Sequence, residues 1–147
     1  DLAAAAQVQA QLVQAALARL ADAGGRDAPL VIAELPGLRD PDGRSPFWQG
    51  LGARFFTGDP DEAAARHGPA WPGHVAALLP RQPVYTCLLP APTRAALAQV
   101  HPRSLALMQV LWDAGLRYDH HVRVDDGGPV LAAPLGRPLQ PSRMQST

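Results

Sequence analysis

The sequence predicts one domain of the α/β or α+β class, in which helices and strands share a core. A long alanine- and leucine-rich segment has helical spacing, and two short runs rich in valine, isoleucine and leucine have the length of strands. The turn sequence DDGG separates two further strand candidates. The 147 residues are enough for one hydrophobic core, and no internal repeat or boundary precedes residue 134. Residues 1–133 are therefore expected to form one unit.

The N-terminal part is predicted to be a helix followed by a strand. Residues 2–22 are strong helix formers, and Leu12, Leu17 and their neighbours keep a helical spacing until Gly24 and Gly25 end it. Residues 28–35, APLVIAEL, form a short apolar run, which predicts a buried strand. This order favours half of a βαβ unit.

The middle of the chain is predicted to hold short helices. Ser45 and Pro46 suit the N-cap and first position of a helix over 45–56, directly after a turn-rich stretch. Further helices are expected near 61–66 and over 73–80.

The C-terminal part is predicted to contain strands at 82–90, 116–124 and 129–133, and helices at 92–100 and 103–114. The last two strands flank DDGG and so form a hairpin. The lone cysteine, Cys87, falls inside the first of these strands and is expected to be a small buried hydrophobe. Residues 134–147 are rich in proline and are predicted to be a disordered tail.

The composition argues against several classes of partner and location. Thirteen basic residues, all of them arginine, balance thirteen acidic ones, which argues against nucleic acid and anionic membranes as partners. No run of apolar residues is long enough to span a membrane, and the N-terminus lacks the basic start of a signal peptide. A single cysteine suits a reducing compartment. We therefore expect a cytoplasmic protein.

The sequence does not predict a metal centre or a permanently bound cofactor. His120 and His121 are neighbours in a predicted strand, so their side chains point to opposite faces. His67 and His74 lie far away in the sequence, and neither HxH nor HExxH spacing occurs. Phosphate-binding and nucleophile-elbow glycine motifs are also absent from the sequence.

His101 occurs in the sequence AQVHP, between two predicted helices. Pro102 disfavours helical backbone at His101, and a histidine at a helix C-terminus interacts favourably with the negative end of the helix dipole. On the residues alone, His101 is a helix-end residue. It becomes an acid–base candidate only if it lies in a cleft.

Four blocks of sequence, in order, resemble the arginine N-succinyltransferase family, which includes subunits acting on arginine and ornithine. The resemblance runs from about residue 29 to residue 133 and is weak over 57–73. The blocks are VIAELPGLRDPDGRSPFWQGLGARFF (31–56), LLPRQPVYTCLLP (78–90), AQVHP (98–102) and GLRYDHHVRVDDGGP (115–129).

The resemblance implies a GNAT-like acyltransferase half-domain, with a central mixed sheet flanked by helices. It implies transfer of a succinyl group from succinyl-CoA, the co-substrate, to the α-amine of L-arginine in arginine catabolism. The family's proton-donor histidine lies in the QVHP motif, which matches His101. Weaker substrate-binding candidates in the specific blocks, for which capping, packing or ion pairing are also available roles, are Glu34, Arg44, Ser45, Trp48 and Tyr85.

Part of the family pattern is missing from this chain. The family's acyl-CoA-binding stretch lies upstream of the first helix, so the chain resembles the C-terminal part of the enzyme. We therefore expect a piece of a longer enzyme, one chain of a homo- or hetero-oligomer, or a degenerate copy. The alternative function is that of a non-catalytic or regulatory subunit of a two-chain acyltransferase.

Individual residues also depart from the family pattern. Pro36 stands where the family has arginine, while His121, Arg123 and Asp125 stand where it has tyrosine, aspartate and phenylalanine. If that aspartate contacts the cationic substrate, Arg123 changes the selectivity for the amine. If the aspartate is structural, selectivity is unaffected.

Overall fold

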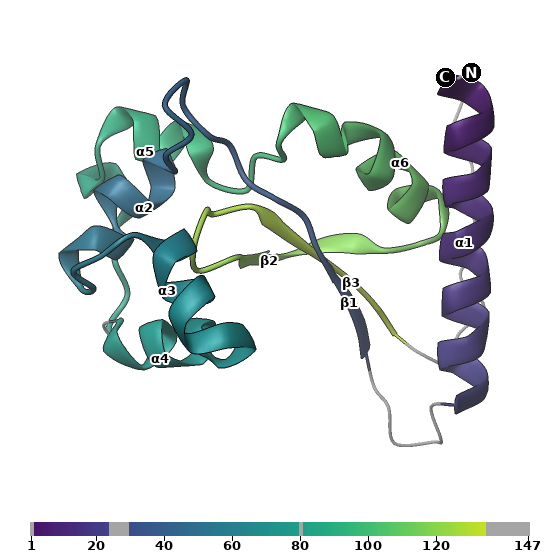
Figure 1. The fold of residues 1–147 in the computed structure, drawn as a ribbon, viewed down its shortest axis with the longest axis horizontal. Helices are drawn as coiled ribbons and strands as arrows, with labels where there is room; N and C mark the ends of the chain where they lie inside the picture. Colours follow the sequence, from purple (N-terminus) through teal and green to yellow (C-terminus); the bar gives the residue numbers. More distant parts are fainter. Residues whose placement is uncertain (1, 24–29, 80, 135–147) are drawn as a thin grey trace.

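The structure is a computed structural model that describes residues 2–23, 30–79 and 81–134. Figure 1 shows an α+β arrangement, with a small sheet at the centre and helices around it. The helices are α1 (Leu2–Ala23), α2 (Pro46–Gly50), α3 (Pro60–His67), α4 (Trp71–Leu78), α5 (Ala91–Ala96) and α6 (Leu105–Asp113). The strands are β1 (Leu30–Glu34), β2 (Arg117–Val122) and β3 (Pro129–Pro134). The predicted tail over 135–147 lies outside the described residues.

The three described strands form one antiparallel sheet in the order β1-β3-β2. Ile32 pairs with Ala132 across β1 and β3, and Tyr118 pairs with Leu131 across β2 and β3. The predicted β2–β3 hairpin is confirmed. The predictions of a mixed sheet and of a βαβ unit are wrong for these strands, because β1 pairs with the C-terminal strand β3 in antiparallel orientation.

The prediction that the 28–35 run is a buried strand is also wrong. β1 is an edge strand whose side chains alternate between the core and an open face. Val31 and Ala33 pack against the core, whereas Leu30 and Ile32 are 54% and 59% exposed. Apolar residues on both faces of β1 make the run look fully buried, although only one face is covered in the described structure.

Two hydrophobic clusters hold the described fold together. The main cluster joins the covered face of the sheet to α6, and α1 packs against it through Val13 and Leu17. The second cluster lies among α2, α3 and α4 and is centred on Trp48 and Trp71. The buried members of the main cluster are Leu35, Leu111, Ala114, Leu116, Leu131 and Ala133. None of the helices in the described ranges is both long and apolar enough to cross a membrane.

The helix predicted over 45–56 begins as expected but is shorter, because α2 ends at Gly50 and a 3₁₀ turn (Gly52–Arg54) follows it. Ser45 is the N-cap of α2, its hydroxyl accepts a hydrogen bond from the Trp48 amide at 3.1 Å, and Pro46 takes the first helical position. Asp59 caps α3 by accepting hydrogen bonds from the amides of Asp61 and Glu62. Side chains close in sequence therefore set where these helices start.

The predicted strand over 82–90 is absent from the structure. This stretch contains a single 3₁₀ turn (Thr86–Leu88), and Cys87 is exposed rather than buried. Pro83 and Pro90 remove two donors that a sheet ladder needs. The run has the composition of a strand, but none of the described strands pairs with it.

A close crossing of two backbones joins β1 to the β2–β3 hairpin. Gly37, just beyond β1, and Gly128, just before β3, approach so closely that neither has room for a side chain. A methyl group on Gly128 would meet the Leu35 carbonyl and lie 2.5 Å from the Gly37 nitrogen. A methyl group on Gly37 would lie 2.8 Å from the Gly128 nitrogen. Only glycine fits on either side of the crossing.

We expect Gly128→Ala to destabilise the fold by about 1–3 kcal/mol or more, because backbone rather than a flexible side chain would have to move. Urea unfolding followed by circular dichroism measures the change. Gly73→Ala is the matched control: Gly73 lies in α4 with open space around it, so alanine should be neutral or stabilise the helix. Equal effects of the two variants would contradict the tight crossing.

We expect Ser45→Ala to lower the free energy of unfolding by about 0.5–2 kcal/mol, because the buried Trp48 amide loses its acceptor. Thermal unfolding measures the loss. Ser45→Asp retains a capping acceptor and is the comparison variant. If both substitutions leave Tm unchanged, the hydroxyl does not cap α2.

Candidate functional site

His101 lies between α5 and α6, but not at the end of a helix. α5 ends at Ala96, and Ala98 then adopts a left-handed backbone with φ 56°. His101 is instead the N-cap of the 3₁₀ turn Pro102–Ser104. The prediction that His101 follows a helix over 92–100 is therefore wrong, and the dipole at a helix C-terminus does not act on the ring.

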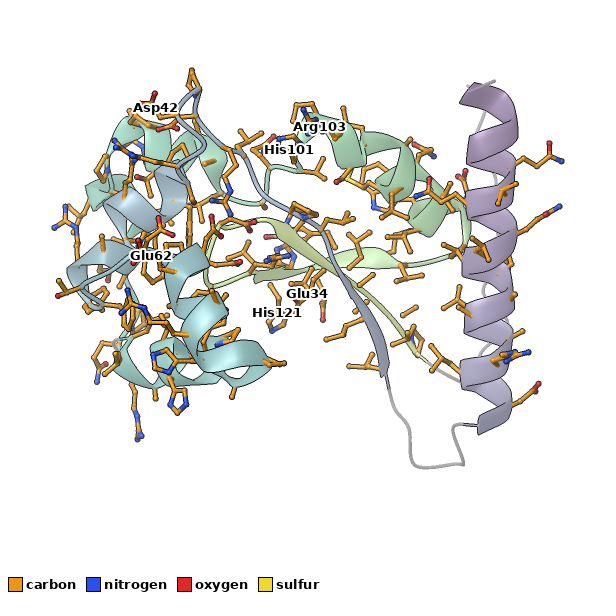
Figure 2. The ribbon with its side chains drawn as sticks, in the orientation of Figure 1. Glu34, Asp42, Glu62, His101, Arg103 and His121 are labelled. Atoms are coloured by element: carbon orange, nitrogen blue, oxygen red, sulfur yellow. The ribbon has the colours of Figure 1, made fainter. Side chains whose placement is uncertain are left out.

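Two backbone contacts hold His101 against the extension of β1. Its amide donates a 2.7 Å hydrogen bond to the Pro36 carbonyl, and Val100 forms a bridge with Gly37. The His101 carbonyl accepts from the Ser104 amide at 2.8 Å, which closes the following turn. Figure 2 shows His101 beside Arg103, in a different part of the molecule from Glu34 and His121.

The imidazole of His101 makes one local hydrogen bond that defines its chemistry. Nδ1 accepts from the Arg103 amide at 3.2 Å, so in the neutral ring the proton is on Nε2. A doubly protonated ring would place an Nδ1–H against the Arg103 N–H and lose this bond. The half-buried ring therefore offers Nε2–H as its donor.

The loop between β2 and β3 contains a compact group of charges. Arg123 donates to both carboxylate oxygens of Asp125, and its Nε lies 3.3 Å from Asp126 Oδ1. Hydrogen bonding to Asp125 raises the pKa of Arg123, against the opposing effect of burial. The two family departures at 123 and 125 thus form an ion pair with each other, which balances the charge of Arg123 within the loop.

Arg39 joins the turn after β1 to α3. Its guanidinium donates to the two carboxylate oxygens of Asp61 at 3.0 and 3.2 Å, and this hydrogen bonding raises the pKa of Arg39. A raised pKa of a basic group stabilises the fold below that group's unfolded pKa. The contributions of Arg39 and Arg123 are therefore fully present at neutral pH and are lost only at strongly alkaline pH.

Two of the sequence candidates have clear structural tasks. Ser45 is buried and caps α2, as described above. Trp48 is buried between Phe56 and Trp71 in edge-to-face contacts, and its indole N–H donates to the Gly58 carbonyl at 3.1 Å. Neither side chain faces solvent in the described structure.

The other three candidates are exposed and lie apart in the sequence. Glu34 ends β1 on the open face of the sheet, where it pairs with Val130, which in turn pairs with His121. Arg44 lies in the turn closed by Asp40, and Tyr85 is 73% exposed before the Thr86–Leu88 turn. Apart from the neighbours Ser45 and Trp48, no side-chain contact described above brings these candidates together or joins them to His101.

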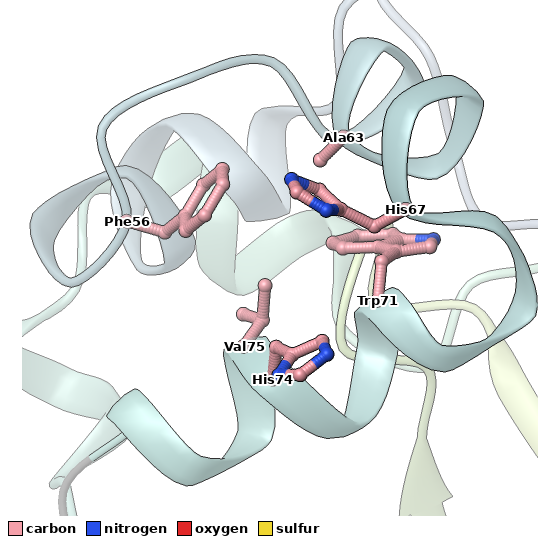
Figure 3. Close-up of a pocket in the computed structure, with 6 residues that line it drawn as sticks. All are labelled: Phe56, Ala63, His67, Trp71, His74 and Val75. Atoms are coloured by element: carbon pink, nitrogen blue, oxygen red, sulfur yellow. The ribbon is translucent and has the colours of Figure 1, made fainter.

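Two cavities lie near histidines. One, of about 300 Å³, lies between α6 and the β2–β3 hairpin and has a mostly apolar lining that includes Trp112 and Tyr118. Val100, the residue before His101, also lines it. The other, of about 180 Å³, is shown in Figure 3 and is walled by Phe56, Trp71 and Val75. His67 and His74 line this smaller cavity, with ring centroids 6.4 Å apart.

Metal ligation finds little support in the described residues. Over residues 2–23, 30–79 and 81–134, no three His, Cys, Asp or Glu side chains gather closely enough to hold a metal ion. The cavity with His67 and His74 offers two imidazoles and otherwise apolar walls.

Sequence reasoning did not find the residues that place His101. Gly37 and Gly128 approach in backbone contact beside its segment, and Asp126 accepts from the Gly128 amide, although DDGG predicted only a turn. The signal available was the pair of glycines in motifs far apart in sequence. Their contact becomes visible only once β1 and β3 are known to pair.

Comparison with known proteins places the chain in a family. A model of the arginine N-succinyltransferase beta subunit matches residues 3–138. The arginine N-succinyltransferases of Salmonella arizonae and Salmonella newport are each 39% identical to it over 107 residues, which is 73% of this chain and 31% of theirs. The chain therefore spans about a third of these relatives.

A solved structure agrees with the sequence comparisons. The arginine/ornithine succinyltransferase subunit AI from Pseudomonas aeruginosa is similar at a TM-score of 0.62 and 30% identity, over 82% of this chain and 34% of that chain. Taken together, these matches show that the chain belongs to the arginine N-succinyltransferase family and covers part of its length.

Proposed function

We propose that this chain supplies the proton-donating part of an arginine N-succinyltransferase, with His101 as the donor. Family membership supports arginine as the amine and succinyl-CoA as the co-substrate. The observation that carries the proposal is the hydrogen bond from the Arg103 amide to Nδ1, which leaves Nε2–H as the donor atom. A fixed donor atom suits general acid catalysis.

The proposed reaction moves the succinyl group in two steps. The α-amine of arginine attacks the thioester carbonyl carbon, forming a C–N bond and a tetrahedral oxyanion. The intermediate then collapses, the C–S bond breaks, and its electron pair leaves on the CoA sulfur. Nε2 of His101 gives its proton to that thiolate while the ring regains the proton released by the amine, so the two transfers occur together, no imidazolate anion forms and the ring ends in its starting state.

The rest of the active site has to come from outside the described residues. The chain spans about a third of its relatives, and one face of its sheet leaves Leu30 and Ile32 exposed. These observations favour completion by a further part of the family's fold, in the same polypeptide or in a second one. We propose that this further part binds CoA.

A non-catalytic subunit is the second candidate function. The partial coverage of the relatives favours it. The exposed, separate positions of Glu34, Arg44 and Tyr85 also favour it, because substrate-binding residues are expected to converge on one cavity. In that case the chain would complete an active partner without providing the acid.

The proposal predicts a large effect of one substitution. In the complete assembly that contains this chain, His101→Ala should lower kcat/KM by about 10²–10⁴-fold, because general acid catalysis contributes that much. Thiol release from succinyl-CoA in the presence of L-arginine measures the rate.

His74→Ala is the matched control, since His74 is an exposed histidine on α4 and should be neutral. A loss of less than about two-fold for His101→Ala in a folded assembly would exclude the donor role. If His101→Ala keeps full activity but omission of this chain abolishes it, the chain is a non-catalytic subunit instead.

A further inference from the structure

Asp126 is a buried acid whose side chain organises the tip of the β2–β3 hairpin. It is 2% exposed, and its Oδ1 accepts a 3.0 Å hydrogen bond from the Gly128 amide two residues on. This bond fixes the turn around Gly127, which has a left-handed φ of 69°. Nε of Arg123 lies 3.3 Å from the same oxygen. The Arg123 amide donates to the Gly128 carbonyl, and the Arg123 carbonyl accepts from the Gly127 amide, which closes the loop. One carboxylate thus holds the conformation of the tip.

The hairpin tip that Asp126 organises binds the segment over 98–101, which contains His101, at the first residue of that segment. The Gly127 carbonyl accepts a 2.9 Å hydrogen bond from the Ala98 amide. Ala98 has a left-handed backbone, which alanine rarely adopts without support. This bond gives one such support, three residues before His101. Figure 1 shows the tip of the hairpin beside α2, and Gly127 indeed packs closely on Phe47.

The same tip also supports the segment at its end. Gly128 crosses Gly37 in backbone contact, and the Asp126 carbonyl lies on the face of Gly37 where a side chain would start. Gly37 bridges Val100, and the preceding residue, Pro36, accepts the His101 amide. Both ends of the segment over 98–101 are therefore tied to a hairpin tip that depends on Asp126.

We propose that Asp126 is a positioning residue for His101. The inference rests on the proposed function for its catalytic meaning, but the geometry stands on its own contacts. Without the side-chain acceptor, the buried Gly128 amide loses its partner and the tip relaxes. Both ties to the segment over 98–101 then loosen, so the turn that begins at His101 loses its anchor on the Pro36 carbonyl and the bond from the Arg103 amide to Nδ1 is formed for less of the time. The ring samples both tautomers, and Nε2–H is no longer presented in one direction.

Nuclear magnetic resonance of ¹⁵N-histidine-labelled protein tests the proposal, because the ring nitrogen shifts distinguish the two tautomers. In the wild type we expect His101 to carry its proton on Nε2. Asp126→Ala should move the His101 signals toward a mixture of tautomers. Asp126→Asn should keep the wild-type signals, because its amide oxygen can still accept from Gly128, which would separate hydrogen bonding from charge.

Asp59→Ala is the matched control. Asp59 also accepts backbone N–H bonds, at the start of α3, and none of its described bonds reaches the His101 segment. It should lower Tm without moving the His101 signals. If Asp59→Ala shifts them as much as Asp126→Ala does, or if folded Asp126→Ala leaves them unchanged, Asp126 does not position the ring.

Two further measurements separate the possible failures. In the complete assembly, Asp126→Ala should lower kcat by up to about 10²-fold while KM stays within about two-fold. If Asp126→Ala shifts the His101 signals but His101→Ala leaves the rate unchanged, the proposed function is overturned and the positioning role of Asp126 stands. If Asp126→Ala does not fold, amide hydrogen exchange of the wild type tests the proposal. The Ala98, His101 and Gly128 amides should have the same protection factor, because they open together. Unequal protection factors would overturn the proposal.

Discussion

The arrangement of this protein depends on one constraint, the backbone crossing of Gly37 and Gly128. Because no side chain fits on either side, the extension of β1 and the tip of the hairpin can approach to contact distance. That approach allows residues 36–37 to bind the end of the segment over 98–101 that contains His101. Gly127 binds the beginning of the same segment through the Ala98 amide. The two hydrophobic clusters stabilise the elements on either side, but the crossing sets how the histidine segment lies between them.

The chemistry of His101 has a local and a distant origin. The local origin is the turn after it, in which Pro102 allows the Arg103 amide to reach Nδ1 and so leaves the proton on Nε2. The distant origin is the hairpin, which holds the segment from both ends. A general acid needs both, because a correct tautomer that points elsewhere transfers no proton. The charge of Arg123 does not disturb this, since it is paired within the loop.

Local signals predicted the elements whose structure depends on near neighbours. The helix α1, the Ser45 cap with Pro46, and the DDGG hairpin follow from side chains a few residues apart. The prediction of a strand over 82–90 is wrong, because a strand needs a pairing partner and composition does not show whether one is present. The prediction that β1 is buried is wrong because an apolar pattern does not show whether a second layer covers the strand.

By itself, the sequence determined which family the chain resembles and which histidine stands in the QVHP motif, because both depend on residue identity alone. It could not determine which ring nitrogen bears the proton, since that is set by a backbone amide in a particular turn. Nor could it show that Trp48 is buried between Phe56 and Trp71, or that Arg123 is balanced by Asp125. The Trp48 packing needs residues that only the tertiary structure brings together, whereas the bonds at His101 and Arg123 join near neighbours and depend on the backbone conformation of their turns. The role of Asp126 is the extreme case, since it acts on His101 through backbone that is far away in sequence and adjacent only in the folded chain.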